Sequence, residues 1–220
     1  IMKLILEDVK FKGTILNQVI EPEVNLTHLS YEFEFGKVYH IASERQWDGW
    51  AFNLLIAGAI VEQAGIIKLN DTIVSPYQRG KMSWRVHRDE IMRFGLFIQS
   101  VKNQIRAGIK KGNRYPLSEQ DYIQNFKLTP QRYDRYLRQQ SSEGWRSSCA
   151  IGLAHDKQIF CFPPFEHGRK NVVSTSFVED HGERWFFDML KFMKSLNCLI
   201  LLPLPIDMDT SEFCDGVIKV

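Results

Sequence analysis

The stretch KVYHIASERQWDGWAFNLLIAG, from Lys37 to Gly58, restricts the fold more than any other part of the sequence. It begins with an apolar run typical of a buried strand, breaks into a mostly polar loop, and continues as an apolar helix that ends near Gly58. A strand, a loop and a helix in this order form a phosphate cradle in many nucleotide-binding proteins. Here, however, the loop holds Glu44, Asp48 and two tryptophans, with Gly49 as its one glycine.

The totals indicate an ordinary globular domain. A length of 220 residues suits one domain with a substantial core, and a net charge of +2 does not indicate a nucleic-acid binder. The longest apolar run, Cys198 to Ile206, is shorter than the roughly 20 residues that span a bilayer, and we expect no signal peptide. The four cysteines form no C-x-x-C pair and the histidines show no ligand spacing, so we expect reduced thiols and no metal site.

Strands and helices follow one another in an order that predicts an α/β fold. An antiparallel hairpin comes first, then the strand, loop and helix, a block of helices, and finally a strand, a helix and two strands. Continuous apolar strands between helices predict a mostly parallel sheet with helices on both faces. The predicted strands are 2–12, 29–35, 37–42, the 65–74 hairpin, 94–99, 158–162, 198–202 and 216–220. The predicted helices are 50–57, 100–110, 118–126, 129–138, 142–154 and 179–195.

This order, with several local phrases, resembles the nucleotide-binding subunit of ABC transporters over essentially the whole chain. The phrases are KVYHIASERQWDGWAFNLLIAG, AGIIKLNDTIVS, FGLFIQS, LAHDKQIFCF, NCLILLPLPI and CDGVIKV. The resemblance implies a P-loop NTPase-like ABC ATPase domain with an N-terminal antiparallel β subdomain. It implies a single domain over 1–220, with a core at about 1–99 and 156–220 and a helical subdomain at about 100–155. It also makes Gln99 the Q-loop glutamine that contacts a partner.

The residues at the family's nucleotide-binding positions do not have the chemistry that those positions require. A Walker A loop needs glycines, a lysine and a hydroxyl, so that backbone N–H groups, an ammonium and Mg²⁺ can meet the phosphates. The resemblance places Asp48, Gly49, Trp50 and Ala51 on the G-K-S/T-T core of this motif, and Ser43 and Gln46 on its earlier glycines. Arg45 is the only cation in the loop.

The other catalytic positions are altered in the same way. The Walker B aspartate and glutamate align with Pro163 and Pro164, which carry no carboxylate. The switch histidine aligns with Leu204, and Phe11 is a weak candidate for the aromatic residue that stacks on adenine. The signature loop aligns with Gln139, Gln140, Ser141, Ser142 and Glu143.

We therefore expect a pseudo-ATPase that has no catalytic residues and binds no cofactor. It would be a structural or regulatory subunit of a membrane transport or export complex. Its partners would be a transmembrane subunit, a second ABC ATPase subunit, or both, in a homodimer or heterodimer. The expected location is cytoplasmic, peripheral to the inner face of the membrane.

Two alternatives remain open. One is a divergent ABC ATPase subunit that still binds or hydrolyses ATP with a partner, using residues such as Arg45 and Glu166. The other is a soluble ABC-type protein that binds nucleic acid, although the small net charge disfavours such a partner. Three groups of basic residues favour this alternative slightly. The same groups would instead offer a surface to an acidic cytoplasmic loop or to anionic headgroups. They are Lys102, Arg106 and Lys110; Arg132, Arg135 and Arg138; and Arg79, Lys81, Arg85 and Arg88, in an insertion expected to be exposed.

Overall fold

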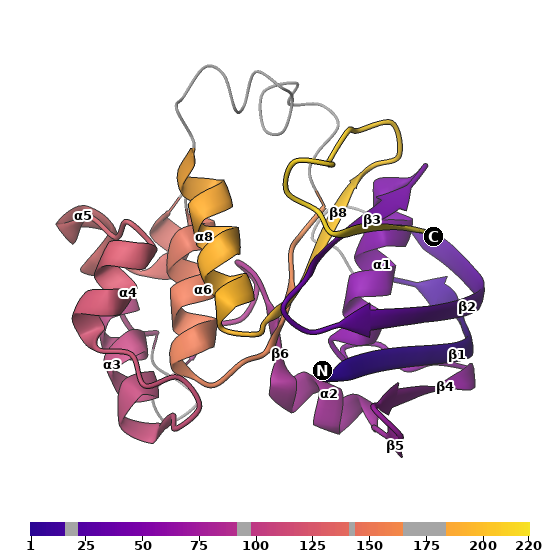
Figure 1. The fold of residues 1–220 in the computed structure, drawn as a ribbon, viewed down its shortest axis with the longest axis horizontal. Coiled ribbons are helices and arrows are strands. Elements are labelled where there is room, and N and C mark those ends of the chain that lie inside the picture. The colour runs from indigo at the N-terminus through magenta and orange to yellow at the C-terminus, as the bar shows by residue number, and fades with distance from the viewer. Residues whose placement is uncertain (16–21, 92–97, 141–143, 165–183) are drawn as a thin grey trace.

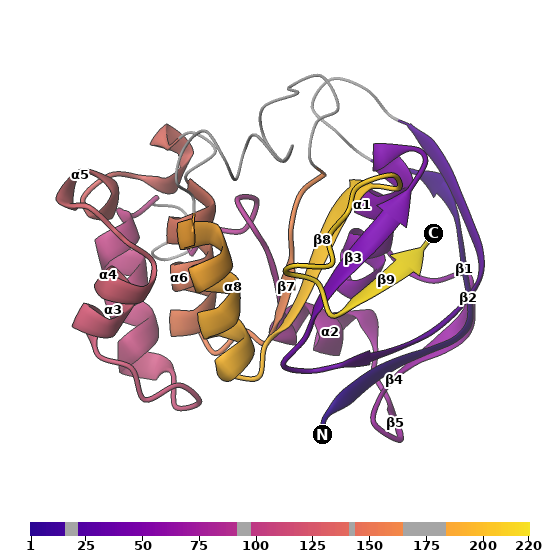
Figure 2. The same ribbon diagram turned by 45° about the horizontal axis from the view of Figure 1, so that its top comes forward.

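The computed structural model describes residues 1–15, 22–91, 98–140, 144–164 and 184–220. They form two sheets with helices between and beside them (Figures 1 and 2). The strands are β1 (Lys3–Thr14), β2 (Glu23–Glu34), β3 (Val38–Ser43), β4 (Ala64–Leu69), β5 (Thr72–Ile73), β6 (Ser83–Arg85), β7 (Ile159–Cys161), β8 (Leu199–Pro205) and β9 (Gly216–Lys219). The helices are α1 (Gln46–Ile56), α2 (Pro76–Met82), α3 (Val101–Lys111), α4 (Glu119–Asn125), α5 (Pro130–Tyr133), the 3₁₀ helix η1 (Leu137–Gln139), α6 (Gly144–Ala154) and α8 (Arg184–Ser195).

The two sheets differ in strand direction, as the sequence predicts. The order β2-β1-β4-β5 is antiparallel, whereas β6-β7-β8-β3-β9 is parallel throughout. All six residues of β3 are buried, because β8 and β9 flank this strand and helices cover both faces. This confirms the predicted α/β class with an N-terminal antiparallel part.

Successive residues of β8 point to opposite faces of the parallel sheet and so build two cores. Ile200 and Leu202 pack with α6, α8 and the helical block, whereas Leu199 and Leu201 pack with α1 and the antiparallel sheet. The layers are visible in Figure 2: the antiparallel sheet, α1, the parallel sheet, then α6 and α8, with α3, α4 and α5 outermost. The predicted division into a core and a helical subdomain stays a prediction.

The helical block begins where capping residues predict it. The hydroxyls of Ser100, Ser118 and Thr129 accept hydrogen bonds from backbone N–H groups in the first turns of α3, α4 and α5. The predicted helix 129–138 is wrong in its second half, where it divides into α5 and η1. The reason is tertiary: the Val101 N–H donates to the carbonyl of Arg135, and Ser100 forms a β-bridge with Tyr136.

The edge of the parallel sheet differs from the prediction. The edge strand is β6, which pairs with β7 and which the sequence does not predict, and α2 before it is also missed. Most of the predicted strand 94–99 lies outside the described residues, and Ile98 and Gln99 are not in a strand. The helix had a local signal, because Ser75 and Gln78 form a capping box around Pro76 at the first helical position.

The basic residues around α2, predicted to be exposed, are only partly so. Lys81 and Arg88 are exposed, but Arg79 is only 1% exposed. Its guanidinium donates to both carboxylate oxygens of Glu62 and to the carbonyl of Val74. A charge is buried at this depth only when it is paired and hydrogen-bonded, so Arg79 serves to fasten α2 to the segment after α1.

Two glycines at the contact between α1 and α2 give a matched stability test. Gly58 has φ +68°, and a Cβ on it would lie 2.0 Å from the carbonyl oxygen of Pro76. A Cβ on Gly80, inside α2, would lie 3.5 Å from its nearest neighbour, the carbonyl oxygen of Ala57. We predict that Gly58→Ala lowers the free energy of unfolding by about 2 kcal/mol or more, and that Gly80→Ala raises it by about 0.5–1 kcal/mol. Urea denaturation measures both, and equal effects would contradict the packing described.

Candidate functional site: the junction of β3 and α1

The connection between β3 and α1 is much shorter than the predicted loop. The strand ends at Ser43 and the helix begins at Gln46, so only Glu44 and Arg45 lie between them. The predicted helix start at Trp50 is therefore wrong by four residues. The Arg45 guanidinium donates to both carboxylate oxygens of Asp48, at 2.8 and 2.6 Å, and so closes the first turn. A carboxylate in that turn also favours the helix through the dipole.

Gly49 brings α1 close to the sheet. A Cβ on Gly49 would lie 2.9 Å from the Ser43 hydroxyl and 3.1 Å from Cβ of Pro203. The position that the resemblance assigns to the phosphate-binding lysine thus faces the carboxyl ends of β3 and β8 at close range. Trp50 and Ala51, on the next two positions, are buried in the core between α1 and the antiparallel sheet.

The end of β7 is tied to α1 by a residue that the sequence analysis missed. The Asn53 side chain is fully buried, and its Nδ2 donates to the carbonyls of Phe162 (2.9 Å) and Leu201 (3.3 Å). Pro163 and Pro164 follow at once. The Asn53 amide therefore contacts the residue that directly precedes the predicted Walker B positions. In the sequence, Asn53 could have been found as the single polar residue of the apolar run WAFNLLIAG.

A buried histidine holds the end of β8. Leu204, the predicted switch position, is 3% exposed, and its carbonyl lies 3.2 Å from Nε2 of His40 on β3. Since a carbonyl only accepts, Nε2 donates and Nδ1 accepts from the Thr210 hydroxyl, 3.1 Å away. Burial lowers the pKa of His40. The polar residue inside the apolar run KVYHIA was the signal for this contact.

The remaining predicted positions are not brought to this junction in the described residues. Gln99 is fastened locally, since its carbonyl accepts from Nε2 of Gln104 at 3.0 Å. Phe11 pairs with Leu26 inside the β core, where its ring is 8% exposed and cannot stack on a base. The signature positions Ser141, Ser142 and Glu143, and Glu166, lie outside the described residues.

Both basic stripes of the helical block contain ion pairs with acids. Arg106 makes a two-pronged contact with Glu119, and Lys102 lies 3.4 Å from Asp134. The Arg138 guanidinium donates to Glu90, whose side chain is 8% exposed. These contacts reduce the positive field that a nucleic-acid or headgroup surface requires.

Comparison with known proteins identifies the fold. Neither a protein family nor a curated sequence matches the chain. Solved structures do match it. A putative ABC transporter ATP-binding protein from Pyrococcus furiosus has 15% identity and a TM-score of 0.65, covering 99% of this chain and 96% of that one. A dimeric bacterial ABC transporter cassette has 13% identity and a TM-score of 0.65, covering 99% and 94%.

A third match is a bacterial Atm1-family ABC exporter with ATP bound. It has 15% identity and a TM-score of 0.63, and it covers 99% of this chain but only 36% of the exporter. The chain thus spans about a third of the exporter and nearly all of the separate ATP-binding proteins. At such identities the likeness shows the fold, which is that of ABC ATPases. Among the described helices, none is long and apolar enough to cross a bilayer.

The contact between Gly49 and Ser43 gives a prediction for this junction. Alanine favours a helix over glycine by about 1 kcal/mol, yet overpacking costs about 1–3 kcal/mol. We predict that Gly49→Ala lowers the free energy of unfolding by about 1 kcal/mol, and that adding Ser43→Ala recovers more than half of the loss. Chemical denaturation of the four proteins of this double-mutant cycle measures the coupling. Strictly additive effects would show that the two residues are not in contact.

The buried histidines give a prediction for pH. The folded protein lowers the pKa of His40, His87 and His155, in each case mainly by burial. The unfolded chain therefore binds more protons once the pH falls below about 6.5, so the contribution of these histidines to stability is full well above that pH and declines below it. We predict a lower urea midpoint at pH 5.5 than at pH 7.5.

His40→Gln supplies the control for this effect, because an amide can replace the contact with Leu204 and does not titrate. The difference in midpoint between pH 7.5 and 5.5 should be smaller in this variant. Asp8, Glu34 and Glu119 have lowered pKa values through hydrogen bonds to His28, Lys37 and Arg106, so their contributions are lost only near pH 4 and below. If His40→Gln showed the same difference in urea midpoint between pH 7.5 and 5.5 as the unchanged protein, His40 would not be a source of the pH dependence.

Proposed function

We propose that this chain is a catalytically inactive ABC-type nucleotide-binding domain. It keeps the fold as a structural or regulatory subunit of a membrane transport or export complex. The observation that carries the proposal is the packing of Gly49 on Ser43 and Pro203, where the resemblance places the phosphate-binding lysine. Neither ATP nor Mg²⁺ fits the groups at this junction.

Sterics and charge both support this proposal. A glycine-rich loop binds phosphate because its backbone N–H groups surround the anion, and here only Glu44 and Arg45 separate β3 from α1. The Asp48 carboxylate lies in the first turn of α1, where a triphosphate would otherwise benefit from the dipole, and already pairs with Arg45. A second anion there would meet like charge.

Turnover would need groups that the described residues do not supply. In ABC-type phosphoryl transfer, acidic residues after the β7-equivalent strand hold Mg²⁺ and orient the attacking water. Pro163 and Pro164 occupy these positions. Leu204 is buried in the core in place of the switch histidine. Each lost group removes several kcal/mol of transition-state stabilisation, and about 1.4 kcal/mol is a tenfold change in rate.

The proposed partners are a transmembrane subunit, a second ATPase subunit, or both, with the chain at the cytoplasmic face of the membrane. The similar structures include a dimeric transporter cassette and an exporter, which supports a domain built for assembly. Two exposed apolar side chains lie near Gln99: Ile98 (38% exposed), and Tyr136 (44% exposed), whose backbone forms the bridge with Ser100. Exposed apolar side chains in one place are typical of a contact surface.

Calorimetric titration with ATP and Mg²⁺ tests the proposal. We predict no binding with a Kd below about 1 mM and no phosphate release above the rate without protein. A micromolar Kd would overturn the proposal. If such binding occurred, a large loss of ATP affinity in Arg45→Gln would support the alternative of a divergent site, because Arg45 is the only cation in the sequence from 43 to 51.

A further inference from the structure

A groove between α8 and the segment that precedes β9 is the second place where the structure gathers chemistry. It has a volume of about 310 Å³ and uses none of the residues of the β3–α1 junction. One wall is a stripe of α8, in which Phe187, Leu190, Lys191 and Lys194 follow at helical spacing. The other wall is the segment 211–215.

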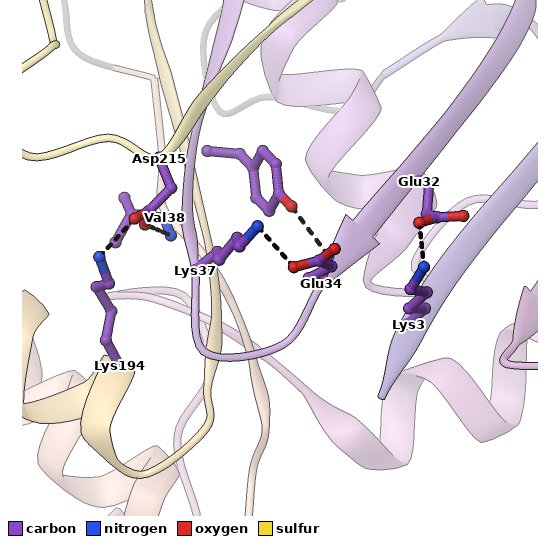
Figure 3. Close-up of polar contacts among 8 residues, drawn as sticks. Lys3, Glu32, Glu34, Lys37, Val38, Lys194 and Asp215 are labelled. Atoms are coloured by element: carbon purple, nitrogen blue, oxygen red, sulfur yellow. Dashed lines mark hydrogen bonds and ion pairs between the residues drawn. The ribbon is translucent and has the colours of Figure 1, made fainter. Parts of the chain in front are cut away.

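Hydrogen bonds to Thr210, Val38 and Lys194 hold the wall opposite α8 in place. The N–H groups of Phe213 and Cys214 donate to the carbonyl of Thr210, and the hydroxyl of the same residue contacts the buried His40 on β3. At the far end, Asp215 accepts from the Val38 N–H at 2.8 Å and from the Lys194 ammonium at 2.7 Å. Figure 3 shows this contact joining α8 to the start of β3. The groove is therefore built from fixed elements.

One part of the groove is aromatic and uncharged. The rings of Phe187 and Phe213 lie with centroids 5.1 Å apart and planes inclined by 36°, and Leu190 is 2% exposed beneath them. Burial raises the pKa of the Cys214 thiol to about 12, so this side chain stays neutral at physiological pH. This part suits an apolar or aromatic side chain.

Four charged side chains border the groove, and two of them pair with each other. The Lys194 ammonium and the Asp215 carboxylate neutralise each other. Lys191 and Glu212 are exposed, and neither has an ion-pair partner among the described residues. A ligand with one negative and one positive group would pair with both Lys191 and Glu212. A simple carboxylate would leave Glu212 without a partner, and a simple amine would leave Lys191 without one.

We propose that this groove binds a free α-amino acid with a large apolar or aromatic side chain. The carboxylate contacts Lys191, the ammonium contacts Glu212, and the side chain packs on Phe187 and Phe213. The small volume, at the low end of the range for ligand pockets, favours a ligand of this size over a nucleotide. This site would add a small-molecule input to a domain proposed to have lost its nucleotide.

Titration of the full chain with phenylalanine, followed by amide chemical shifts in NMR spectra, tests the proposal. Phenylalanine should shift the amides of 211–215 and of α8 with a Kd on the order of 1 mM, the affinity that a ligand of this size reaches. 3-Phenylpropionate and phenethylamine, which each lack one charge, should bind at least about fivefold more weakly. Binding of 3-phenylpropionate as tight as that of phenylalanine would overturn the proposal, as would no shift at about 20 mM.

Lys191→Gln and Glu212→Gln separate this site from non-specific binding, because both side chains are exposed and their loss leaves the fold intact. Each should weaken phenylalanine binding about three- to tenfold. Lys111→Gln, an exposed lysine at the end of α3, is the matched control and should leave the Kd unchanged. An equal Kd in all four proteins would refute the assignment of the charges.

Discussion

Close contact between α1 and the carboxyl end of β3 is the constraint on which the centre of this protein depends. Glycine at position 49 lets the helix backbone approach Ser43 and Pro203, and this approach sets the depth at which Trp50, Ala51 and the rest of α1 enter the core. The resemblance places the phosphate-binding lysine at this same position, and the proposed loss of nucleotide binding rests on this contact. In that proposal, packing between helix and sheet and binding of an anion at the helix terminus compete for one volume.

Buried polar groups join the layers around this contact. Asn53 links α1 to both β7 and β8, and His40 links β3 to the end of β8 and to Thr210. At the partly exposed end of α6, the Asp156 carboxylate accepts from the N–H groups of Asn113 and Arg114 and so holds the loop after α3. In the interior, both ring nitrogens of His40 are hydrogen-bonded, and an unsatisfied polar group there would cost about 1–3 kcal/mol. The proposed amino-acid groove depends on one of these links, since Thr210 positions its second wall.

Much of the fold could be predicted from local pattern. The alternation of 29–35, the apolar run 37–42 and the caps at Ser100, Ser118 and Thr129 each correspond to an observed element. Two errors arise where distant contacts override local preference. The helix 129–138 divides because 134–136 meet the start of α3, and β6 is a strand because β7 lies beside it. Arg79 belongs to the same class, as its sequence context reads as exposed until Glu62 is placed next to it. The start of α1 at Gln46 is different, because the Arg45–Asp48 pair in its first turn joins residues only three apart.

The sequence by itself determined the chemistry that is present: prolines at 163 and 164, an aspartate at 48, and a single glycine between β3 and the middle of α1. It also determined the succession of strands and helices, because side-chain periodicity and caps act over a few residues. Only the tertiary structure decided that Gly49 lies against Ser43, that Asn53 and His40 hydrogen-bond to carbonyls at strand ends, and that Phe187 packs against Phe213. Those relations join residues distant in the chain, and their distances depend on how whole layers pack, which no local pattern encodes.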